Sequence, residues 1–404
     1  MQLTQSAKLR IAQGCERTAF YLVLDLIALY ANEKMGYSEA SAILLSGLLG
    51  GAAYVGPIFG GVLADTVLTR ARALAIGASI LSLSYLALAF QMPLLIVAIG
   101  IAIGNGLYKP SSTASCGQLA QKEDVRTAYY KFYMAINIGG LLAPIVGELS
   151  KHLFGWTITF LIAALFLQIS KTIVTSPKML EALDTQTTEI NENIETQKYY
   201  TTEKTLYLLY FIASIFWCCF NQFAGSMTFW ARDLTDRNMF GFVVAPALFA
   251  ALNSLYVILL TDKPAKLCDK LNISFKSQLT IGMLFMSFAF FVMSMSALNT
   301  SQSNKASMLL LIFVYFVMTI SELLISPAIL TLISDSAPKN RTTLHMGFWF
   351  GSCAAGHFAS GYLGSLKSSL GYDATFFMLT VLAGIGALLM FVVNRNIKEL
   401  NFNK

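Results

Sequence analysis

Twelve apolar runs divide this chain of 404 residues, and they constrain its fold more than any single motif does. Most runs hold roughly 20 residues, enough for a helix to cross the ~30 Å hydrocarbon core of a bilayer. A helix is expected because lipid offers no hydrogen-bond partners to an open backbone. The runs fall near 9–31, 40–63, 73–91, 94–119, 130–150, 156–175, 205–230, 241–260, 277–297, 307–332, 343–366 and 373–394. The sequence therefore predicts an all-α membrane protein with 12 transmembrane helices.

The composition agrees with a membrane protein and argues against catalysis. Only 12% of the residues are charged and 56% are hydrophobic, whereas soluble domains carry about 25% charged residues. The sequence contains no nucleotide-binding loop, no hydrolase elbow and no zinc-ligand spacing. We therefore predict no catalytic residue, no metal, no cofactor and no nucleic-acid partner. The chain is not predicted to be an enzyme.

The distribution of basic residues predicts the orientation. Most of the 28 lysines and arginines fall in loops on the side of the N-terminus. Cytoplasmic loops carry such an excess, so both termini are expected in the cytoplasm. The chain is expected to cross the cell membrane several times. Nothing in the sequence points to an oligomer, and we expect a monomer.

A polar stretch separates two halves of the chain. Residues 176–204 are rich in Thr, Glu, Asn and Gln, and we interpret them as a cytoplasmic linker that can include a short surface helix. The predicted domains are an N-terminal six-helix bundle (1–175), this linker (176–204), and a C-terminal six-helix bundle with a short tail (205–404).

Corresponding features in the two halves support an internal repeat. Pro57 matches Pro246, and Pro110 matches Pro327. Two parallel six-helix repeats with broken helices around a midplane site are the arrangement of major facilitator transporters. The alternative is that prolines are simply common in membrane helices.

Two opposite charges precede the second pair of prolines at membrane depth. Lys109 lies near the middle of 94–119, where a cation is costly unless it meets a partner or water. Glu322 lies correspondingly in 307–332. We predict a polar cavity in which the two residues form a gating contact between the halves. A snorkelling lysine and a purely structural ion pair are the alternatives.

The first predicted helix carries further buried charges. Gln13, Arg17 and Tyr21 share one face, and Glu16 lies beside it. Glu16 and Arg17 either belong to the lining of the polar cavity or form a structural pair near the interface. Asp25 lies deeper, and it must be protonated, paired or hydrated.

Amides and aromatic side chains complete the predicted lining. These are Asn137, Asn221, Gln222, Asn253, Tyr21, Tyr54 and Trp349. They suit a polar organic solute, although a single membrane amide often only joins helices. His345 is expected to be incidental.

The segment 60–72, GGVLADTVLTRAR, is a separate candidate motif. Gly61, Asp65, Arg70 and Arg72 are predicted to control conformation, with Asp65 accepting hydrogen bonds from the next helix or from the arginines. An ordinary tight turn is the alternative.

Several of these stretches together resemble the proton-dependent oligopeptide transporter family. CERTAFY, YVGPIFGGVLAD, GNGLYKPSSTASCGQL, FYMAINIGGLLAP, SELLISPAIL and MGFWF carry the resemblance, which covers nearly the whole chain outside the linker. It implies symport of di- and tripeptides with protons. It implies peptide binding by Tyr21, Tyr54, Asn137, Asn253, Glu322 and Trp349, with Glu322 receiving the peptide amino terminus, and proton coupling by Glu16, Arg17 and Lys109.

The chain departs from the family pattern at three positions. Gln13 and Asn221 replace family glutamates, and Leu24 replaces an arginine that the family is thought to use for the peptide carboxylate. Lys109 then becomes the expected cation for that carboxylate, and Asp25 and Glu322 become additional candidates for the proton. The two extra helices of many bacterial members are also predicted to be absent.

These departures leave other functions open. The same fold could carry another solute, such as an amino acid or a cationic metabolite, with altered or no proton coupling. A transport-inactive sensor or scaffold is a third possibility from a different class.

Overall fold

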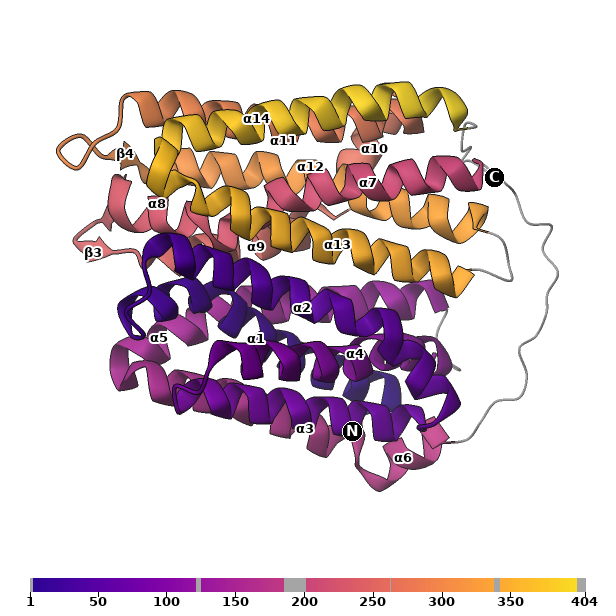
Figure 1. Ribbon diagram of the computed structural model, residues 1–404. Coiled ribbons are helices and arrows are strands. Elements are labelled where there is room, and N and C mark those ends of the chain that lie inside the picture. Colours follow the sequence, from indigo (N-terminus) through magenta and orange to yellow (C-terminus); the bar gives the residue numbers. More distant parts are fainter. Residues whose placement is uncertain (1–2, 121–124, 185–200, 262, 338–341, 398–404) are drawn as a thin grey trace. The chain divides into compact units, whose positions relative to one another are not determined.

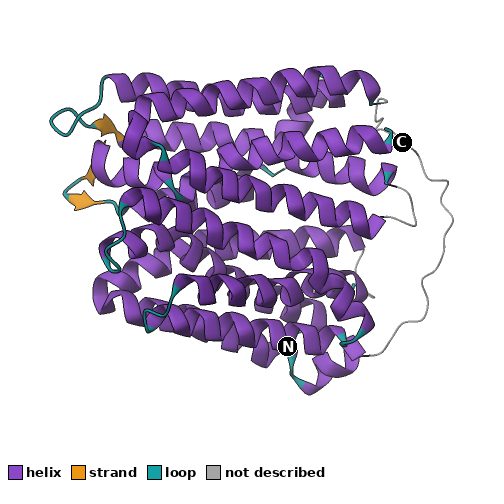
Figure 2. Cartoon of the chain, viewed as in Figure 1, coloured by secondary structure: helices purple, strands orange, loops and turns teal. Residues whose placement is uncertain are grey.

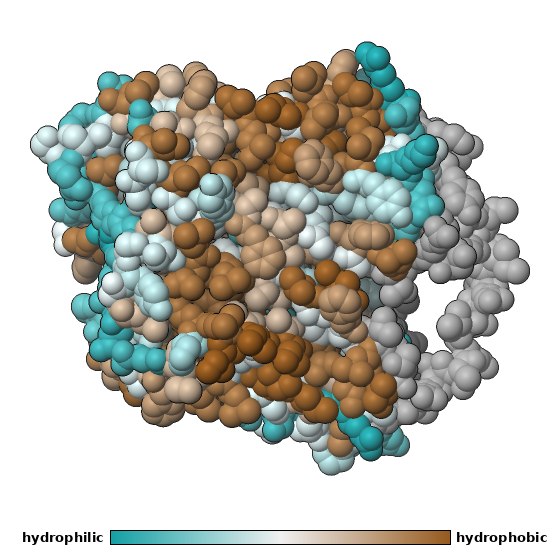
Figure 3. Space-filling model, viewed as in Figure 1, coloured by the Kyte–Doolittle hydropathy of each residue, from teal (hydrophilic) through white to brown (hydrophobic). Residues whose placement is uncertain are grey.

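The computed structural model describes residues 3–120, 125–184, 201–261, 263–337 and 342–397, which form two compact units. The first unit lies within residues 1–38 and 48–191, and the second within 39–47 and 192–404. Each is built almost entirely of helices (Figure 1, Figure 2). Apolar residues cover the middle of the helices on the visible face, and hydrophilic residues gather at the helix ends (Figure 3). This distribution suits a protein embedded in a bilayer.

Helices α1 to α6 span the first part of the chain. They are α1 (Gln5–Glu33), α2 (Glu39–Thr66), α3 (Arg70–Ala89), α4 (Leu94–Gln118), α5 (Val125–Val174) and α6 (Pro177–Asp184). The first turns of α2, residues 39–47, belong to the second unit. Gly155 has a left-handed φ of 78° and divides α5 into two helices, which correspond to the predicted runs 130–150 and 156–175.

Close helix contacts hold the first unit together. α1 packs along α5, and α3 packs against both α4 and α5. A Cβ added to Gly147 of α5 would lie 2.7 Å from Leu26 Cδ1 of α1, so a larger residue would require the Leu26 side chain to shift. Tyr30 donates a 2.7 Å hydrogen bond to the carbonyl of Leu88, which ties the end of α1 to α3.

Helix α6 occupies the beginning of the predicted linker and is docked on the first unit. Met179 and Leu183 are buried, and Gln118 of α4 donates a 3.0 Å hydrogen bond to the carbonyl of Ala182. The expected short helix is therefore present, and it packs on the unit instead of standing free. Residues 185–200 of the predicted linker lie outside the described chain.

The second unit contains helices of very different lengths and short strands of two residues. Its elements are α7 (Glu203–Phe220), η1 (Asn221–Ala224), α8 (Ser226–Leu234), β1 (Thr235–Asp236), β2 (Asn238–Met239), β3 (Phe242–Val243), η2 (Pro246–Ala250), α9 (Ala251–Leu260), α10 (Lys263–Lys270), α11 (Phe275–Leu298), β4 (Ala306–Ser307), α12 (Met308–Ser336), α13 (Thr342–Ser365), α14 (Lys367–Val393) and η4 (Asn394–Asn396). β1 pairs with β4 in parallel, and β2 pairs with β3 in antiparallel. The two pairs close loops at one end of the unit (Figure 2).

Two predicted helices of this unit have different forms. The run 205–230 is interrupted, because the 3-10 turn η1 and Gly225 separate α7 from α8. The run 241–260 begins as the β2–β3 hairpin, and only 251–260 is α-helical. Pro246 consequently starts η2, where its missing N–H costs nothing. Pro57 lies inside α2, whereas Pro246 does not lie inside an α-helix. The prediction that these two prolines occupy corresponding positions within helices is therefore wrong.

Eight described helical stretches are long and apolar enough to cross a membrane by length and composition. Residues 127–174 form one of these stretches although Gly155 divides them. The structure thus agrees with a multi-pass, all-helical membrane protein. The number of 12 crossings stays a prediction.

Candidate functional site

A buried ion pair forms the centre of the first unit's polar residues. Arg17 donates to both carboxylate oxygens of Glu16, from Nε to Oε2 and from Nη2 to Oε1, each at 2.5 Å. Gln13 Nε2 donates to Glu16 Oε2 at 3.1 Å. Glu16 is completely buried and Arg17 is 3% exposed. The structure therefore brings the predicted pair together in the interior of the unit, and whether the pair lies near the membrane interface stays a prediction.

Asn105 of α4 extends this pair, and the sequence reasoning missed it. Its Oδ1 accepts a 3.1 Å hydrogen bond from Arg17 Nη2, and its side chain is 1% exposed. Burying a bidentate pair requires such additional partners, because both ions have lost their water. The available sequence signal was an amide within the run GNG of a predicted membrane helix.

Aromatic rings connect the ion pair to Lys109. Tyr21 lies with its ring centroid 5.8 Å from Arg17 Cζ, and Tyr54 of α2 also interacts electrostatically with Arg17. Lys109 Nζ of α4 lies 3.8 Å from the ring centroid of Tyr54. Such a cation–π contact contributes about 0.5–2 kcal/mol, depending on desolvation. Tyr54 thus lies beside two other predicted site residues, Arg17 and Lys109.

Glycines bring the helices carrying Tyr54 and Lys109 close together. A Cβ on Gly56 would lie 1.7 Å from the carbonyl oxygen of Ala102, and one on Gly60 would lie 2.0 Å from that of Gly106. Gly56 and Gly60 form a G-x-x-x-G face, which lets membrane helices approach closely. This helix crossing and the ring of Tyr54 therefore both position Lys109.

Asp25 and Asn137 lie in the same unit but take no part in this cluster of contacts. Asp25 is 4% exposed, and its buried Oδ1 accepts no hydrogen bond within the described residues. Asn137 is buried and donates to the carbonyl of Tyr133 in its own helix at 3.0 Å. A buried carboxyl without a described partner is unusual, so Asp25 stays a candidate for proton uptake.

The predicted conformational motif is only partly described. Gly61 and Asp65 lie in α2, but their side chains lie outside the described residues. Arg70 donates a 2.7 Å hydrogen bond from Nη1 to Gln118 Oε1 of α4, and the backbone N–H of Arg72 donates to Thr69 Oγ1. Arg70 thus joins α3 to α4, while the predicted clamp by Asp65 stays a prediction.

In the second unit, two of the predicted site residues, Glu322 and Asn253, are in contact. Asn253 Nδ2 of α9 donates a 2.9 Å hydrogen bond to Glu322 Oε2 of α12, and it lies 3.1 Å from Thr319 Oγ1. Glu322 is half-buried. The partner is a neutral amide, which orients this carboxyl group without bringing an opposing charge. The predicted contact with Lys109 joins residues of different units and stays a prediction.

Trp349 packs against another aromatic side chain of the second unit. Its ring stands edge-to-face with Trp217 of α7, with centroids 6.1 Å apart, and it is 5% exposed. A Cβ on Gly356 would lie 2.4 Å from Trp217 Cβ, so a glycine in α13 allows the approach of α7. The position fits a wall of the site more than a direct polar contact.

The two amides at the α7 break have different environments. Gln222 is completely buried, donates to the carbonyl of Ser360 at 3.1 Å, and accepts from Ser226 Oγ at 2.6 Å. It joins α8 and α13 across the break, and its predicted place in the cavity lining is wrong. Asn221 is 8% exposed with a buried Nδ2 that has no described partner, so it remains a candidate for the lining.

His345 is part of a buried polar cluster, contrary to the expectation that it is incidental. Its Nδ1 lies 2.9 Å from Tyr210 Oη, and its Nε2 lies 3.5 Å from Glu203 Oε1. Tyr207 Oη donates to the same carboxylate oxygen at 3.0 Å. These contacts join α7 to α13. Single histidines give no such signal in a sequence, because the partners lie more than 100 positions away.

A second charged cluster lies within the second unit, around the beginning of α2. Glu39 accepts hydrogen bonds from Arg232 and Lys367. Lys367 also donates to Tyr372 Oη at 2.9 Å, and Arg232 Nε donates to Asp233 Oδ1 at 2.6 Å. These interactions explain why the first turns of α2 belong to this unit. From the sequence alone, Arg232 and Lys367 were counted only as basic residues in loops.

Comparisons with known proteins agree with this architecture. A family model described as Major Facilitator Superfamily matches residues 11–341. Dipeptide and tripeptide permease A of Pectobacterium carotovorum is 24% identical over 93% of this chain and 88% of its own length. Dipeptide and tripeptide permease A of Escherichia coli is also 24% identical, over 87% of this chain and 82% of its own length.

Solved structures show the same fold. A crystal structure of the peptide transporter POT in complex with sulfate aligns with a TM-score of 0.83 at 21% identity, covering 98% of this chain and 96% of that one. A POT family transporter in complex with 5-aminolevulinic acid aligns with a TM-score of 0.82 at 19% identity, covering 96% of each chain.

Proposed function

The chain belongs to the Major Facilitator Superfamily, and from this membership we propose that it is a secondary transporter that takes up di- and tripeptides together with protons. The resemblance to oligopeptide transporters is confirmed by the relatives and the solved structures. The superfamily consists of transporters, so the prediction that the chain is not an enzyme is confirmed. Peptides are the substrate that the permease names give to its relatives.

The observation that carries the proposal is the hydrogen bond between Asn253 and Glu322 in the second unit. It fixes one carboxylate oxygen and leaves a half-buried negative charge for a positively charged group. The α-amino group of a peptide is such a group, and a hydrogen bond to a charged partner contributes about 1.5–3 kcal/mol. We assign Glu322 to the peptide ammonium, with Tyr21, Asn137 and Trp349 as further binding residues.

Lys109 is assigned to the peptide carboxylate. Arg17 is engaged by both oxygens of Glu16, and Lys109 lies with its Nζ against the ring of Tyr54. A lysine ammonium group is a suitable hydrogen-bond donor to a carboxylate. This assignment explains how the chain binds a peptide carboxylate although Leu24 stands where the family has an arginine.

Three carboxyl groups are proposed for proton coupling. Protonation of Glu16 would remove the charge that Arg17 requires, so it would change the conformation of α1. Protonation of Glu322 would compete with binding of the ammonium. Asp25 is buried beside neither cation in the contacts described, and it is the third candidate.

We further propose the organisation predicted from the sequence. It comprises 12 crossings without extra inter-bundle helices, bundles within 1–175 and 205–404, and both termini in the cytoplasm. We propose that the protein works as a monomer in the cell membrane. Labelling of single introduced cysteines from either side of the membrane would test the orientation.

A second candidate is transport of another small solute bearing an ammonium group. Asn221 and Leu24 remove one family charge pair, and the buried amide nitrogen of Asn221 has no described partner. One structural neighbour was solved in complex with 5-aminolevulinic acid. Stabilisation by peptides alone in a thermal-shift screen of peptides, amino acids and amines would exclude this candidate.

Uptake into proteoliposomes tests the first proposal. Dipeptide uptake should increase with an inward-directed proton gradient, and Glu322→Gln and Lys109→Ala should each abolish most of it. Glu181→Gln on α6 removes a charge away from the site and should transport normally. Unchanged uptake by both site variants would overturn the assignment.

A further inference from the structure

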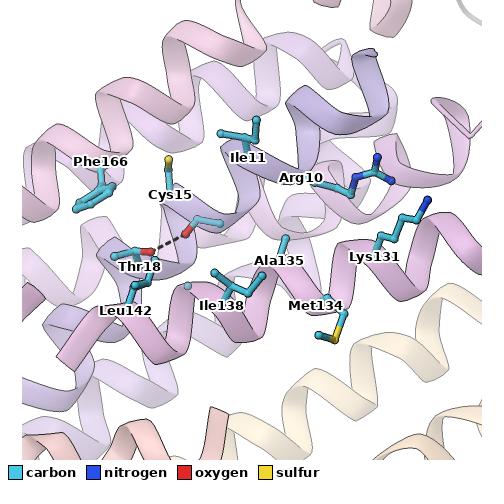
Figure 4. Close-up of a pocket in the computed structure, with 12 residues that line it drawn as sticks. Arg10, Ile11, Cys15, Thr18, Lys131, Met134, Ala135, Ile138, Leu142 and Phe166 are labelled. Carbon is cyan, nitrogen blue, oxygen red and sulfur yellow. Dashed lines mark hydrogen bonds between the residues drawn. The ribbon is translucent and has the colours of Figure 1, made fainter. Parts of the chain in front are cut away.

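The two faces of α1 differ in how their polar atoms are satisfied. One face borders a pocket of 570 Å³, where the Thr18 hydroxyl donates a 2.9 Å hydrogen bond to the carbonyl of Gly14 (Figure 4). Glu16 and Arg17 are not among the residues that line this pocket. Around their ion pair, by contrast, several buried polar atoms have no hydrogen-bond partner within the described residues.

Two amides beside the pair each use only one end. Gln13 Nε2 donates to Glu16 Oε2 at 3.1 Å, while Gln13 Oε1 has no partner among the residues that the structure describes. Asn105 Oδ1 accepts from Arg17 Nη2 at 3.1 Å, while the same holds for Asn105 Nδ2. The two side chains are 2% and 1% exposed, so bulk water does not reach the unused ends.

The charges of the pair fix which end of each amide is unused. A carboxylate only accepts hydrogen bonds, so Gln13 must turn its nitrogen toward Glu16 and its oxygen away. A guanidinium only donates, so Asn105 must turn its oxygen toward Arg17 and its nitrogen away. Flipping either amide would place two acceptors or two donors against each other. The unused ends are therefore one acceptor and one donor, both beside the same ion pair.

A hydroxyl from a third helix adds to this set. Tyr85 of α3 is fully buried and interacts electrostatically with both Glu16 and Arg17. Its Oη has no hydrogen-bond partner in the described part of the chain. A tyrosine hydroxyl can both donate and accept. Tyr30 of α1 is buried to a similar degree, but its hydroxyl donates a 2.7 Å hydrogen bond to the carbonyl of Leu88.

From these atoms we propose that buried water binds between Gln13 Oε1, Asn105 Nδ2 and Tyr85 Oη and hydrates the ion pair. Buried polar atoms are nearly always hydrogen-bonded, because an unpaired one is costly. Water both donates and accepts, as this set requires, and a buried water makes about two to four hydrogen bonds. A metal cation would match only the oxygens of the set, and a simple anion would not match Gln13 Oε1.

The water site deepens the proposed proton coupling, and this step rests on that proposal. Protonation of Glu16 would leave Arg17 without its counterion. A neighbouring water can then accept a hydrogen bond from the guanidinium, which lowers the cost of the protonated state. The titratable side chains with described interactions with the pair are tyrosines, and none supplies a carboxylate in place of Glu16. They are Tyr21, Tyr54, Tyr85 and Tyr108.

Radiolytic hydroxyl labelling tests the water site directly. X-rays generate hydroxyl radicals from water, and a buried side chain is modified where bound water lies beside it. In the full-length protein in detergent, mass spectrometry should find Tyr85 oxidised several-fold faster than Tyr30. Tyr30 is the matched control, because it is a buried tyrosine whose hydroxyl already has a protein partner. Equally low labelling of the two tyrosines would overturn the proposal.

Removing the Tyr85 hydroxyl gives an independent test. A hydrogen bond to water is lost in Tyr85→Phe, so the equilibrium constant of unfolding should rise roughly 2- to 12-fold. A hydroxyl without any partner predicts the opposite, because phenylalanine then removes only a desolvated polar group. Denaturant unfolding of the purified proteins measures the change, and Tyr30→Phe should be destabilised in either case. A Tyr85→Phe variant at least as stable as the wild type would overturn the water site.

Neither measurement depends on transport, so the water site and the proposed function can fail separately. Labelled Tyr85 in a protein whose peptide uptake does not respond to a proton gradient would overturn the coupling and support the water. Proton-dependent uptake by a protein with unlabelled Tyr85 would overturn the water and support the coupling.

Discussion

The two units hold their buried carboxylates in opposite ways. In the first unit, Glu16 is saturated: Arg17 occupies both of its oxygens and Gln13 adds a third hydrogen bond. In the second unit, Glu322 is oriented by the neutral amide of Asn253. The first carboxylate is paired with a cation, whereas the described partner of the second is a neutral amide. The comparison teaches that depth alone does not make a membrane carboxylate a binding residue; the charge of its partner decides.

Removing one member of the Glu16–Arg17 pair should have the largest effect. Glu16→Gln leaves Arg17 buried without its counterion, which costs about 3–5 kcal/mol of stability. Glu16→Gln combined with Arg17→Met should recover much of this loss, because no charge is then stranded. Thermal unfolding of the detergent-purified variants measures both. Equal stability of the single and double variants would contradict this pairing.

Removing the Glu322 carboxylate should affect transport more than stability. Glu322→Gln keeps an acceptor for Asn253, so unfolding should change little. The lost ammonium contact of about 1.5–3 kcal/mol should weaken peptide binding roughly 10- to 150-fold. Uptake as a function of peptide concentration gives the change. A variant that unfolds as readily as Glu16→Gln would show that Glu322 is also structural.

Lys109 should show an intermediate effect. Lys109→Ala removes the cation assigned to the peptide carboxylate, and uptake should fall by roughly 10-fold or more. Lys109→Arg keeps the charge and should retain part of the activity. Tyr54→Phe preserves the ring beneath the cation and serves as the matched control for the cation–π contact. Similar losses in Lys109→Arg and Lys109→Ala would indicate that the shape of the amine matters more than its charge.

The smallest effect is expected at the amide that orients Glu322. Asn253→Ala removes a hydrogen bond worth about 0.5–1.5 kcal/mol, which corresponds to roughly a 2- to 12-fold weaker peptide affinity. Thr319→Val removes only the neighbouring hydroxyl and should change affinity less. Measuring peptide affinity for each purified variant distinguishes the effect of the amide from that of the hydroxyl. An Asn253→Ala loss equal to that of Glu322→Gln would mean that the carboxylate cannot act without its orienting amide.

Much of the fold could be predicted from the sequence because long apolar runs have few alternatives in lipid. The predicted runs correspond to helices from α1 to α14, including the division of α5 at Gly155. The errors are local. The η1 break at 221–224 lies inside a continuous apolar run, and the apolar Phe242 and Val243 form a strand where a helix was predicted.

The site was predictable only in part. Charges at membrane depth identified Glu16, Arg17, Lys109 and Glu322, since each is costly without a partner. The partners themselves depend on helix crossings that one sequence does not reveal. Asn105 was missed and Gln222 was misassigned for this reason: one amide meets Arg17 and the other meets only its neighbouring helices.

The central claim is that Glu322 receives the substrate ammonium, and binding of blocked peptides tests it most directly. Affinities of a dipeptide and of its N-acetylated form are measured for the wild type and for Glu322→Gln. The wild type should prefer the free amine by roughly 10-fold or more, and the variant should bind both forms equally weakly. A preference for the free amine that survives in Glu322→Gln would contradict the account.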